Sequence, residues 1–264
     1  MARPVIALLT DFGIRDHYAG TMKGVALGIC PDATCVDITH DIPPHDVLAG
    51  ALELAASYKY FPAGTVFLVV VDPGVGSSRR SIAAEAGGYR FVAPDNGVLT
   101  LAFRDTPPKR VVELTERRYA RPTVSRTFEG RDRFAPAAAW LAKGIDLSGL
   151  GRLLTSWQSL SVPEPALGED RIVAEVLRVD RFGNLVTNVD RRVFERFAGG
   201  GGIEIVAGTQ AVGTVVATYA DAEPGAVCAL FGSSEHLEIA VSGGSAAKRL
   251  GASAGTPVVV RGGE

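Results

Sequence analysis

Residues 69–80 read VVVDPGVGSSRR, and this stretch decides the fold of the first half of the chain. It continues an apolar run, Val66–Val71, which suits a strand with both faces buried. The run ends at Asp72, glycines follow, and the stretch closes on Arg79 and Arg80. A buried strand that ends in a carboxylate, with guanidinium groups within reach, predicts a polar site at the carboxyl edge of a parallel sheet.

Strand and helix patterns alternate on both sides of this stretch. Strands are expected at 5–10, 34–38 and 66–71, a hairpin at Gly87–Gly88, and helices at 18–30, 46–58 and 133–143. Asp46 and Asp132 are the expected N-caps of the second and third helices. Residues 1–163 are therefore predicted to form an α/β domain with a largely parallel, mixed sheet.

The character of the sequence changes near residue 163. The stretch VPEPALGED (162–170) is Pro-rich and polar, and residues 164–170 within it are predicted to be a linker. Short β-like runs separated by glycines follow, which predicts a smaller all-β, barrel-like domain over 171–264.

Composition excludes several classes of partner. The 264 residues are 47% hydrophobic with a formal net charge of -2, and no basic stripe suggests binding to nucleic acid. No apolar run approaches the length of a membrane span, and the first residues are typical of a strand and not of a signal peptide. The odd count of 3 cysteines favours a reducing compartment, so a cytoplasmic protein is expected.

Three acids follow three predicted strands: Asp11, Asp72 and Asp95. Taken singly, each is an ordinary turn former. Together they could hold a divalent cation, bind ribose hydroxyls or act as a base, and spacing alone does not choose. A metal-dependent phosphoester hydrolase therefore stays open as one interpretation.

Seven motifs occur in a characteristic order: LLTDFG (8–13), THDIPPHDV (39–47), VDPGVGSSRR (71–80), APDNGVLT (93–100), TFEGRDRFAP (127–136), DRFGNLVTN (180–188) and HLEIA (236–240). Over nearly its whole length the chain resembles the S-adenosyl-L-methionine (SAM) hydroxide adenosyltransferases, which are related to the fluorinases and chlorinases. The resemblance implies hydrolysis of SAM to adenosine and L-methionine, with no metal or cofactor. It also implies a homotrimer whose site lies between the first domain of one subunit and the second domain of the next.

The resemblance also implies the site residues. The catalytic set falls on Asp72, Arg79 and Glu129, where Glu129 stands in place of the histidine usual in the family. Asp11 and His45 match ribose-binding positions, and Asp180 and Asn184 match the pair that holds the methionine ends. Phe231, Ser245 and Ala246 match the adenine pocket, and the remaining substrate-binding assignments are Asn96, Phe128 and Phe182.

Chemistry limits the roles that these residues can take. A guanidinium stays protonated, so Arg79 can orient and polarise a water molecule but cannot accept its proton. A carboxylate must do so: Asp72 is the first candidate, and Glu129 is expected to take over the role of the histidine, with Arg79 and Arg131 offsetting the added negative charge. Two alternatives remain, a chlorinase-like halogenase and a non-catalytic protein that binds SAM or adenosine.

Overall fold

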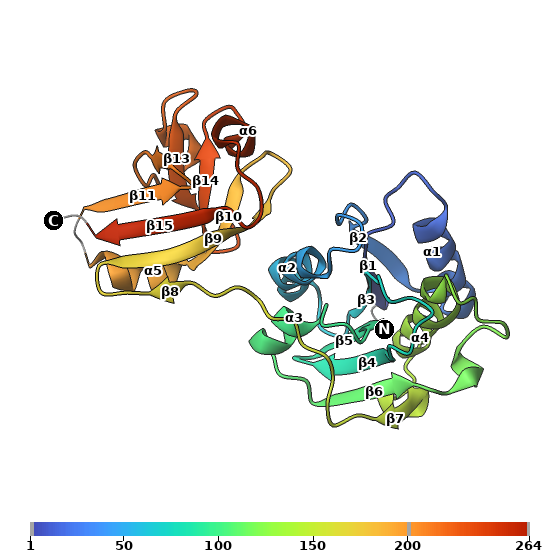
Figure 1. Cartoon of the computed structure of the whole chain (residues 1–264). Coiled ribbons are helices and arrows are strands. Elements are labelled where there is room, and N and C mark those ends of the chain that lie inside the picture. The colour runs from blue at the N-terminus through green and yellow to red at the C-terminus, as the bar shows by residue number, and fades with distance from the viewer. Residues whose placement is uncertain (1–2, 200–201, 263–264) are drawn as a thin grey trace. The chain divides into compact units, whose positions relative to one another are not determined.

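The computed structural model describes residues 3–199 and 202–262 (Figure 1). The chain divides into two compact units, Met1–Ser161 and Val162–Glu264, and each has its own sheet and its own hydrophobic core. The division falls at the start of the Pro-rich stretch where the sequence changes character.

Within residues 3–161 the strands form a seven-stranded sheet in the order β2-β1-β3-β5-β4-β6-β7. The first four strands in this order are parallel, and the last three pair antiparallel to their neighbours, which confirms a largely parallel, mixed sheet. The strands are β1 (Val5–Thr10), β2 (Thr34–Thr39), β3 (Val66–Val70), β4 (Ser81–Ala86), β5 (Tyr89–Pro94), β6 (Arg110–Leu114) and β7 (Gly151–Leu153).

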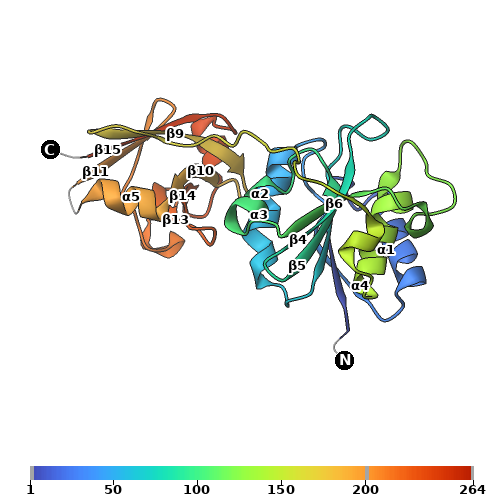
Figure 2. The ribbon, with the colours of Figure 1, turned by 90° about the horizontal axis from the view of Figure 1, so that it is seen from below.

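Helices cover both faces of this sheet, as Figure 2 shows. α1 (Tyr18–Ile29) and α4 (Ala135–Ala142) pack together on one face, and α2 (Val47–Ser57) and α3 (Thr100–Asp105) pack together on the other. Successive residues of the fully buried β3 therefore enter two different cores, since side chains alternate along a strand. Short 3₁₀ turns complete the unit: Tyr58–Tyr60, Arg117–Tyr119 and Leu147–Leu150.

For two of the three expected helices, the sequence predicted an N-cap residue that the structure tests. Asp46 is the N-cap of α2, because its side chain accepts a 2.9 Å hydrogen bond from the Ala49 N–H. The prediction of Asp132 as a cap is wrong. A π-helical turn, Gly130–Phe134, precedes α4, and Asp132 is buried inside that turn, where Arg131 and Arg121 satisfy its carboxylate.

The second unit is an antiparallel sheet that nearly closes into a barrel, as the sequence predicted. The described strands follow the order β12-β11-β15-β9-β10-β14-β13, and a bridge from Val215 to Ala229 lies near the remaining gap. Alternate residues of β9 point inward, including Ile172, Ala174 and Val176. The elements are β8 (Ala166–Leu167), β9 (Arg171–Val179), β10 (Leu185–Asp190), α5 (Arg191–Ala198), β11 (Ile203–Ala207), β12 (Gln210–Val212), a 3₁₀ turn (Tyr219–Asp221), β13 (Val227–Phe231), β14 (His236–Val241), α6 (Ala246–Leu250) and β15 (Pro257–Gly262).

The segment 164–170, predicted as a linker, contains the short strand β8, which pairs with β9. Across residues 3–199 and 202–262, every helix is too short or too polar to cross a membrane.

Candidate active site

The carboxyl ends of β1, β3 and β5 meet at one edge of the first sheet, because the three strands are parallel neighbours. Asp11, Asp72 and Asp95 follow these strands, so the acids share that edge, as the sequence predicted. Their hydrogen-bond partners differ, however, and only Asp72 joins the cluster that the resemblance assigns to catalysis.

Arg79 lies between two carboxylates at this edge. Its Nε donates to Asp72 Oδ1 at 2.8 Å, its Nη2 contacts Asp72 Oδ2, and the same Nη2 donates to Glu129 Oε2 at 2.6 Å. The side chains of Asp72, Arg79 and Glu129 are only 5%, 10% and 14% exposed, so the cluster is largely shielded from water. The three residues that the resemblance assigns to catalysis are therefore in direct contact.

The surroundings keep the guanidinium charged and fixed. Burial alone would lower the pKa of Arg79, but its bonds and charge interactions with Asp72 and Glu129 outweigh burial and raise that pKa. Nη1 of Arg79 donates to Ser81 Oγ at 3.0 Å, and the ring of Phe134 lies 5.2 Å from Cζ. Arg79 is thus a permanent, immobile cation that can polarise a neighbouring molecule.

A tight loop returns the chain from Asp72 to Arg79. Ser77 N–H donates to the Gly74 carbonyl at 3.1 Å, and the Ser77 hydroxyl accepts from the Arg79 N–H at 3.2 Å. Gly76 has a φ of +78°, and a Cβ at this position would lie 2.4 Å from the Arg126 carbonyl oxygen. Glycine is therefore required here both by the backbone conformation and by the close approach of a second segment.

We expect Gly76→Ala to destabilise the first unit by more than about 1 kcal/mol, because strain from the positive φ adds to the clash with Arg126. Gly64→Ala is the matched control, since Gly64 also has a positive φ, +86°, but an added Cβ would meet nothing within 4 Å. Denaturant unfolding of both variants measures the difference. Equal losses would show that the contact with Arg126 contributes nothing.

Glu129 contacts a second arginine, but not the one expected. Its Oε1 lies 3.7 Å from Arg133 Nε, whereas Arg131 binds the neighbouring Asp132 at 2.7 Å and lies over the ring of Phe128. The expectation that Arg131 offsets the charge of Glu129 is therefore wrong, and Arg133 occupies that position. Glu129 Oε1 accepts no hydrogen bond from the described residues, so it is the freest carboxylate oxygen of the cluster.

Asp95 and Asn96 form hydrogen bonds that stabilise the carboxyl edge of the sheet. Asp95 is 4% exposed and accepts hydrogen bonds from Arg80 Nε and from the Gln158 N–H, both at 2.8 Å. The Asn96 amide donates to the Val71 carbonyl and accepts from the Val98 N–H. Within residues 3–199 and 202–262, no three His, Cys, Asp or Glu side chains are grouped so that they could hold a metal ion.

Asp11 orders the segment that carries His45. Its Oδ2 accepts a 2.9 Å hydrogen bond from the His45 N–H, and His45 has a φ of +69°, which is unusual for a residue with a Cβ. Phe128 packs against Phe12 and Tyr18, with ring centroids 6.0 Å and 5.1 Å away. Because Phe128 immediately precedes Glu129 in the sequence, these contacts form an aromatic cluster around the residue next to Glu129.

The predicted residues of the second unit begin with a turn between β9 and β10. Asp180 Oδ1 accepts from the N–H groups of Phe182 and Asn184, and Asp180 Oδ2 accepts from the Asn184 amide at 2.9 Å. The Asn184 amide also lies 3.4 Å from the Tyr219 hydroxyl. Burial, and then a hydrogen bond from that hydroxyl to Glu238, raises the pKa of Tyr219 to about 12.

The same turn packs on the start of α6. A Cβ at Gly183 would lie 2.0 Å from Ser245 Oγ, and the Ala247 N–H donates to the Gly183 carbonyl at 2.9 Å. Ser245 is the N-cap of α6, and Ala246 is fully buried behind it. Asp180, Asn184, Ser245 and Ala246 therefore belong to one region, at which Phe182 is 76% exposed. Phe231 lies at the end of β13 under Arg191, whose Cζ is 4.4 Å from the ring.

Four residues contact the predicted site residues, directly or through one other side chain, but were not themselves predicted from the sequence: Ser81, Arg133, Tyr219 and Glu238. Ser81 directly follows Arg80 and accepts a hydrogen bond from Arg79. The available sequence signal was the predicted hairpin, since β4 begins at Ser81 and pairs with β5. Arg133 stands four positions after Glu129, the spacing of neighbours on a helix face. Tyr219 and Glu238 reach Asn184 only through the fold of the barrel, and no local pattern marks them.

Comparison with known proteins covers almost the entire chain. The profile of the SAM hydroxide adenosyltransferase N-terminal domain matches residues 6–151, and that of the C-terminal domain matches residues 174–259. An (R)-S-adenosyl-L-methionine hydrolase from Thermus thermophilus is 40% identical over 97% of this chain and 98% of its own. A fluorinase from Nocardia brasiliensis is 31% identical over 98% and 97%. A solved structure of an uncharacterized conserved protein from Thermotoga maritima has a TM-score of 0.92 at 35% identity, covering 97% of this chain and 99% of that one.

Proposed function

The chain belongs to the SAM hydroxide adenosyltransferase family, and from that premise we propose that it is an enzyme that hydrolyses SAM to adenosine and L-methionine. The observation that carries the proposal is the buried contact of Arg79 with Asp72 and Glu129 at the carboxyl edge of the sheet. Such a cluster can hold and deprotonate a water molecule without any further group.

The reaction is a displacement at the ribose C5′. The water oxygen forms a bond to C5′ as the bond from C5′ to sulfur breaks, and the sulfur keeps the electron pair to become the thioether of methionine. One proton leaves the water and passes to the enzyme. Because the substrate loses its positive charge, exclusion of water from the site favours the reaction.

Full ionisation of the water before attack is too costly for this site. Water has a pKa of about 15.7, and lowering it to ~7 requires about 12 kcal/mol, which one arginine does not supply. Proton transfer to a carboxylate during the attack avoids that cost. Arg79 then polarises the water and stabilises its developing negative charge.

Glu129 is the better placed of the two bases. Both oxygens of Asp72 already accept bonds from Arg79, whereas Glu129 Oε1 accepts none from the described residues. We therefore assign proton acceptance to Glu129, the orientation of Arg79 to Asp72, and polarisation of the water to Arg79.

The substrate-binding roles follow from the family positions. Asp11 and His45 bind the ribose, Asp180 and Asn184 bind the amino and carboxylate ends of methionine, and the adenine lies against Phe231 and the backbone at Ser245 and Ala246. Support comes from Asp11 Oδ1, which accepts no hydrogen bond in the described part of the chain, and from the packing of the Asp180 turn on Ser245. Asn96, Phe128 and Phe182 complete the proposed set. For Asn96 the role is indirect, since its amide holds backbone.

Water is a better nucleophile than halide here. A halide needs hydroxyl or N–H donors and no competing anion, whereas Asp72 and Glu129 bring two carboxylates to the cluster. Gly130 supplies no hydroxyl, and a Cβ there would lie 3.1 Å from Met22 Sδ, which is tight. The same carboxylates would repel chloride from the reacting carbon.

Incubation with SAM tests the activity directly. We expect adenosine and methionine as products, no 5′-chloroadenosine when chloride is added, and an unchanged rate in EDTA, since we propose that no metal or cofactor takes part. Chromatography of the products measures all three outcomes. Tight binding of SAM without any adenosine would instead identify a binding protein, and inhibition by EDTA would support a metal-dependent hydrolase.

We further propose that the enzyme is a homotrimer in which each site combines the first unit of one subunit with the second unit of the next. Subunit mixing tests this arrangement. Glu129→Gln trimers and Asp180→Asn trimers should both be weakly active. Mixed trimers should regain activity, because about a third of their sites contain neither substitution. No recovery after subunit exchange, checked by light scattering, would place both residues of a site in one chain.

We also propose a cytoplasmic location. Cys30, Cys35 and Cys228 are free thiols, which suits a reducing compartment. Recovery of the protein in a secreted or membrane fraction would contradict this location.

A further inference from the structure

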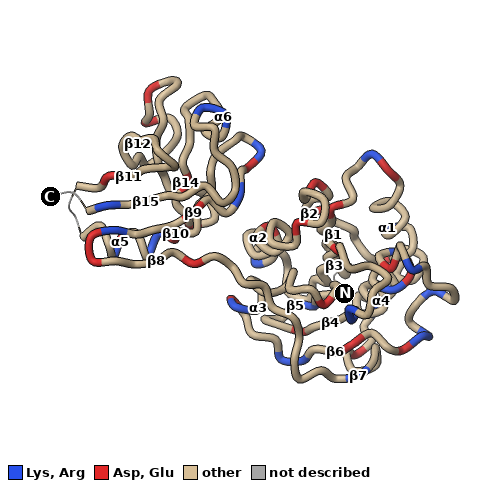
Figure 3. The backbone as a smooth tube through the Cα atoms, in the orientation of Figure 1, with Lys and Arg blue, Asp and Glu red and all other residues tan. Residues whose placement is uncertain are grey.

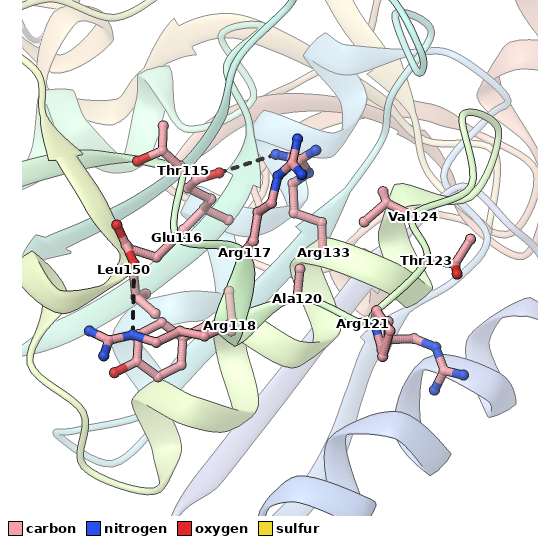
Figure 4. Close-up of a pocket in the computed structure, with 14 residues that line it drawn as sticks. Thr115, Glu116, Arg117, Arg118, Ala120, Arg121, Thr123, Val124, Arg133 and Leu150 are labelled. Atoms are coloured by element: carbon pink, nitrogen blue, oxygen red, sulfur yellow. Dashed lines mark hydrogen bonds and ion pairs between the residues drawn. The ribbon is translucent and has the colours of Figure 1, made fainter.

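A cavity of about 730 Å³ lies beneath the segment that joins β6 to α4 (Figure 4). Its walls include Arg117, Arg118, Arg121 and Arg133 and a single acid, Glu116. Asp72, Arg79 and Glu129 do not line it, but Arg133 does and also lies 3.7 Å from Glu129, so the cavity adjoins the site described above. The tube in Figure 3 shows repeated basic stretches along this same segment.

The charges of these arginines are incompletely neutralised. Arg117 has no acidic partner among the described residues, and Arg118 lies 3.7 Å from Glu116, with a side chain that is 68% exposed. Arg121 pairs with Asp132 at 3.2 Å, but that carboxylate already binds Arg131 at 2.7 Å. The residues that line the cavity therefore carry an excess of positive charge.

Arg133 adds a second, independent observation. Its Nε is buried and has no hydrogen-bond partner within the described residues, although its Nη1 donates to the Leu114 carbonyl at 3.1 Å. Figure 4 shows the guanidinium groups of Arg117 and Arg133 at the same end of the cavity. The nearest anionic oxygen, Glu129 Oε1, lies 3.7 Å from this Nε, too far for a hydrogen bond. A buried N–H without an acceptor is costly, and the oxygen of a bound anion would satisfy it.

The remaining walls favour a small ligand with strong acceptors. Leu114, Ala137 and Leu150 are buried apolar residues of the lining, so an anion held here is partly shielded from water. Planar guanidinium groups match the oxygens of phosphate in a bidentate manner.

We propose that this cavity is a second ligand site, which binds a phosphate-bearing small molecule through Arg117, Arg118 and Arg133. The site is coupled to Glu129, because the anion and the Glu129 carboxylate compete for one guanidinium, that of Arg133. The proposed binding of the anion, and its competition with Glu129 for Arg133, are inferred from geometry alone. Only an effect of the ligand on hydrolysis rests on the proposed function.

Calorimetric titration with inorganic phosphate and pyrophosphate at constant ionic strength tests the binding site. The variant Arg117→Gln/Arg118→Gln should bind pyrophosphate at least about 10-fold more weakly than the native chain. The matched control is Arg152→Gln/Arg261→Gln, which removes two arginines that lie outside the cavity and should change the affinity by less than about 2-fold. The first variant should keep its basal hydrolysis, since neither residue belongs to the proposed catalytic set.

Three results would overturn the binding site: no saturable binding of either probe, equal weakening in both double variants, or displacement of pyrophosphate by adenosine. The last would locate the anion in the SAM site.

Competition for Arg133 has its own readout, which does not require activity. Glu129→Gln should strengthen pyrophosphate binding by roughly 2–5-fold, because it removes the carboxylate that competes for the guanidinium. Arg133→Met should weaken binding at least as much as the double variant. Glu85→Gln serves as control, since Glu85 pairs with Arg110 and lies outside the cavity. An unchanged affinity in Glu129→Gln would disprove the coupling while leaving the site in place.

Discussion

Replacing Arg79 with methionine is expected to lower kcat for SAM hydrolysis by about 10²–10³-fold. It should also destabilise the first unit by roughly 3–5 kcal/mol. Both effects have one cause. The guanidinium bridges Asp72 and Glu129, which are 5% and 14% exposed, so its removal leaves two shielded carboxylates without their shared cation. Product assays and denaturant unfolding measure the two effects separately.

The neighbouring Arg80 provides a matched control. Arg80 also pairs with a buried carboxylate, Asp95, but that pair lies outside the proposed catalytic set. Arg80→Met should therefore lose stability while keeping kcat within about 10-fold once the folded fraction is taken into account. Arg79→Lys adds a second arm, since it keeps the charge without the planar bridge, and should recover stability more than activity. Near-native turnover in Arg79→Met would refute the role of this residue.

The second large effect concerns Glu129. Glu129→Gln should reduce kcat by about 10²–10³-fold, because an amide oxygen accepts a proton far less readily than a carboxylate. Glu129→His should retain much more activity, since histidine is also a general base and is the residue that the family resemblance assigns to this position. Initial rates at saturating SAM, compared with Glu85→Gln as a surface control, measure the effect.

Folding does not confound this comparison strongly. Glutamine is nearly isosteric with Glu129 and can still accept the hydrogen bond from Arg79 Nη2. If the Glu129→Gln enzyme were fully active, Asp72 would be the base instead of Glu129. Full activity in the glutamine variant combined with loss in Asp72→Asn would establish that transfer.

Much of the fold could be predicted from short-range patterns. The apolar run that ends in Asp72 identified the central strand, and topology then placed Asp11 and Asp95 at the same edge. The alternation in β9 and its neighbours likewise predicted the barrel. These features are predictable because burial on one or both faces constrains the sequence residue by residue.

Arg79 was predicted correctly as a partner of Glu129, but the second arginine partner was mispredicted for a physical reason. The sequence predicts a helix that begins only at residue 133, and Glu129 would then lie outside it, so helical spacing does not predict the contact between Glu129 and Arg133. The chain in fact coils from Gly130 as a π-helical turn, a rare form in which hydrogen bonds span one residue more than in an α-helix. Tertiary packing of Phe134 and Asp132 inside the unit stabilises that turn, and no local propensity encodes it.

The bond between Asp11 and the His45 N–H has a consequence for experiments on sugar recognition. A backbone in the left-handed region costs roughly 1 kcal/mol for a residue with a side chain, and this carboxylate is what anchors it. Truncation of Asp11 would therefore act twice, by deleting the proposed ribose contact and by letting the segment around His45 relax. The resulting rise in KM would combine two effects, the loss of preorganised backbone around His45 and the loss of the contact itself. The two effects can be separated only if the conformation of that segment is measured in the same variant.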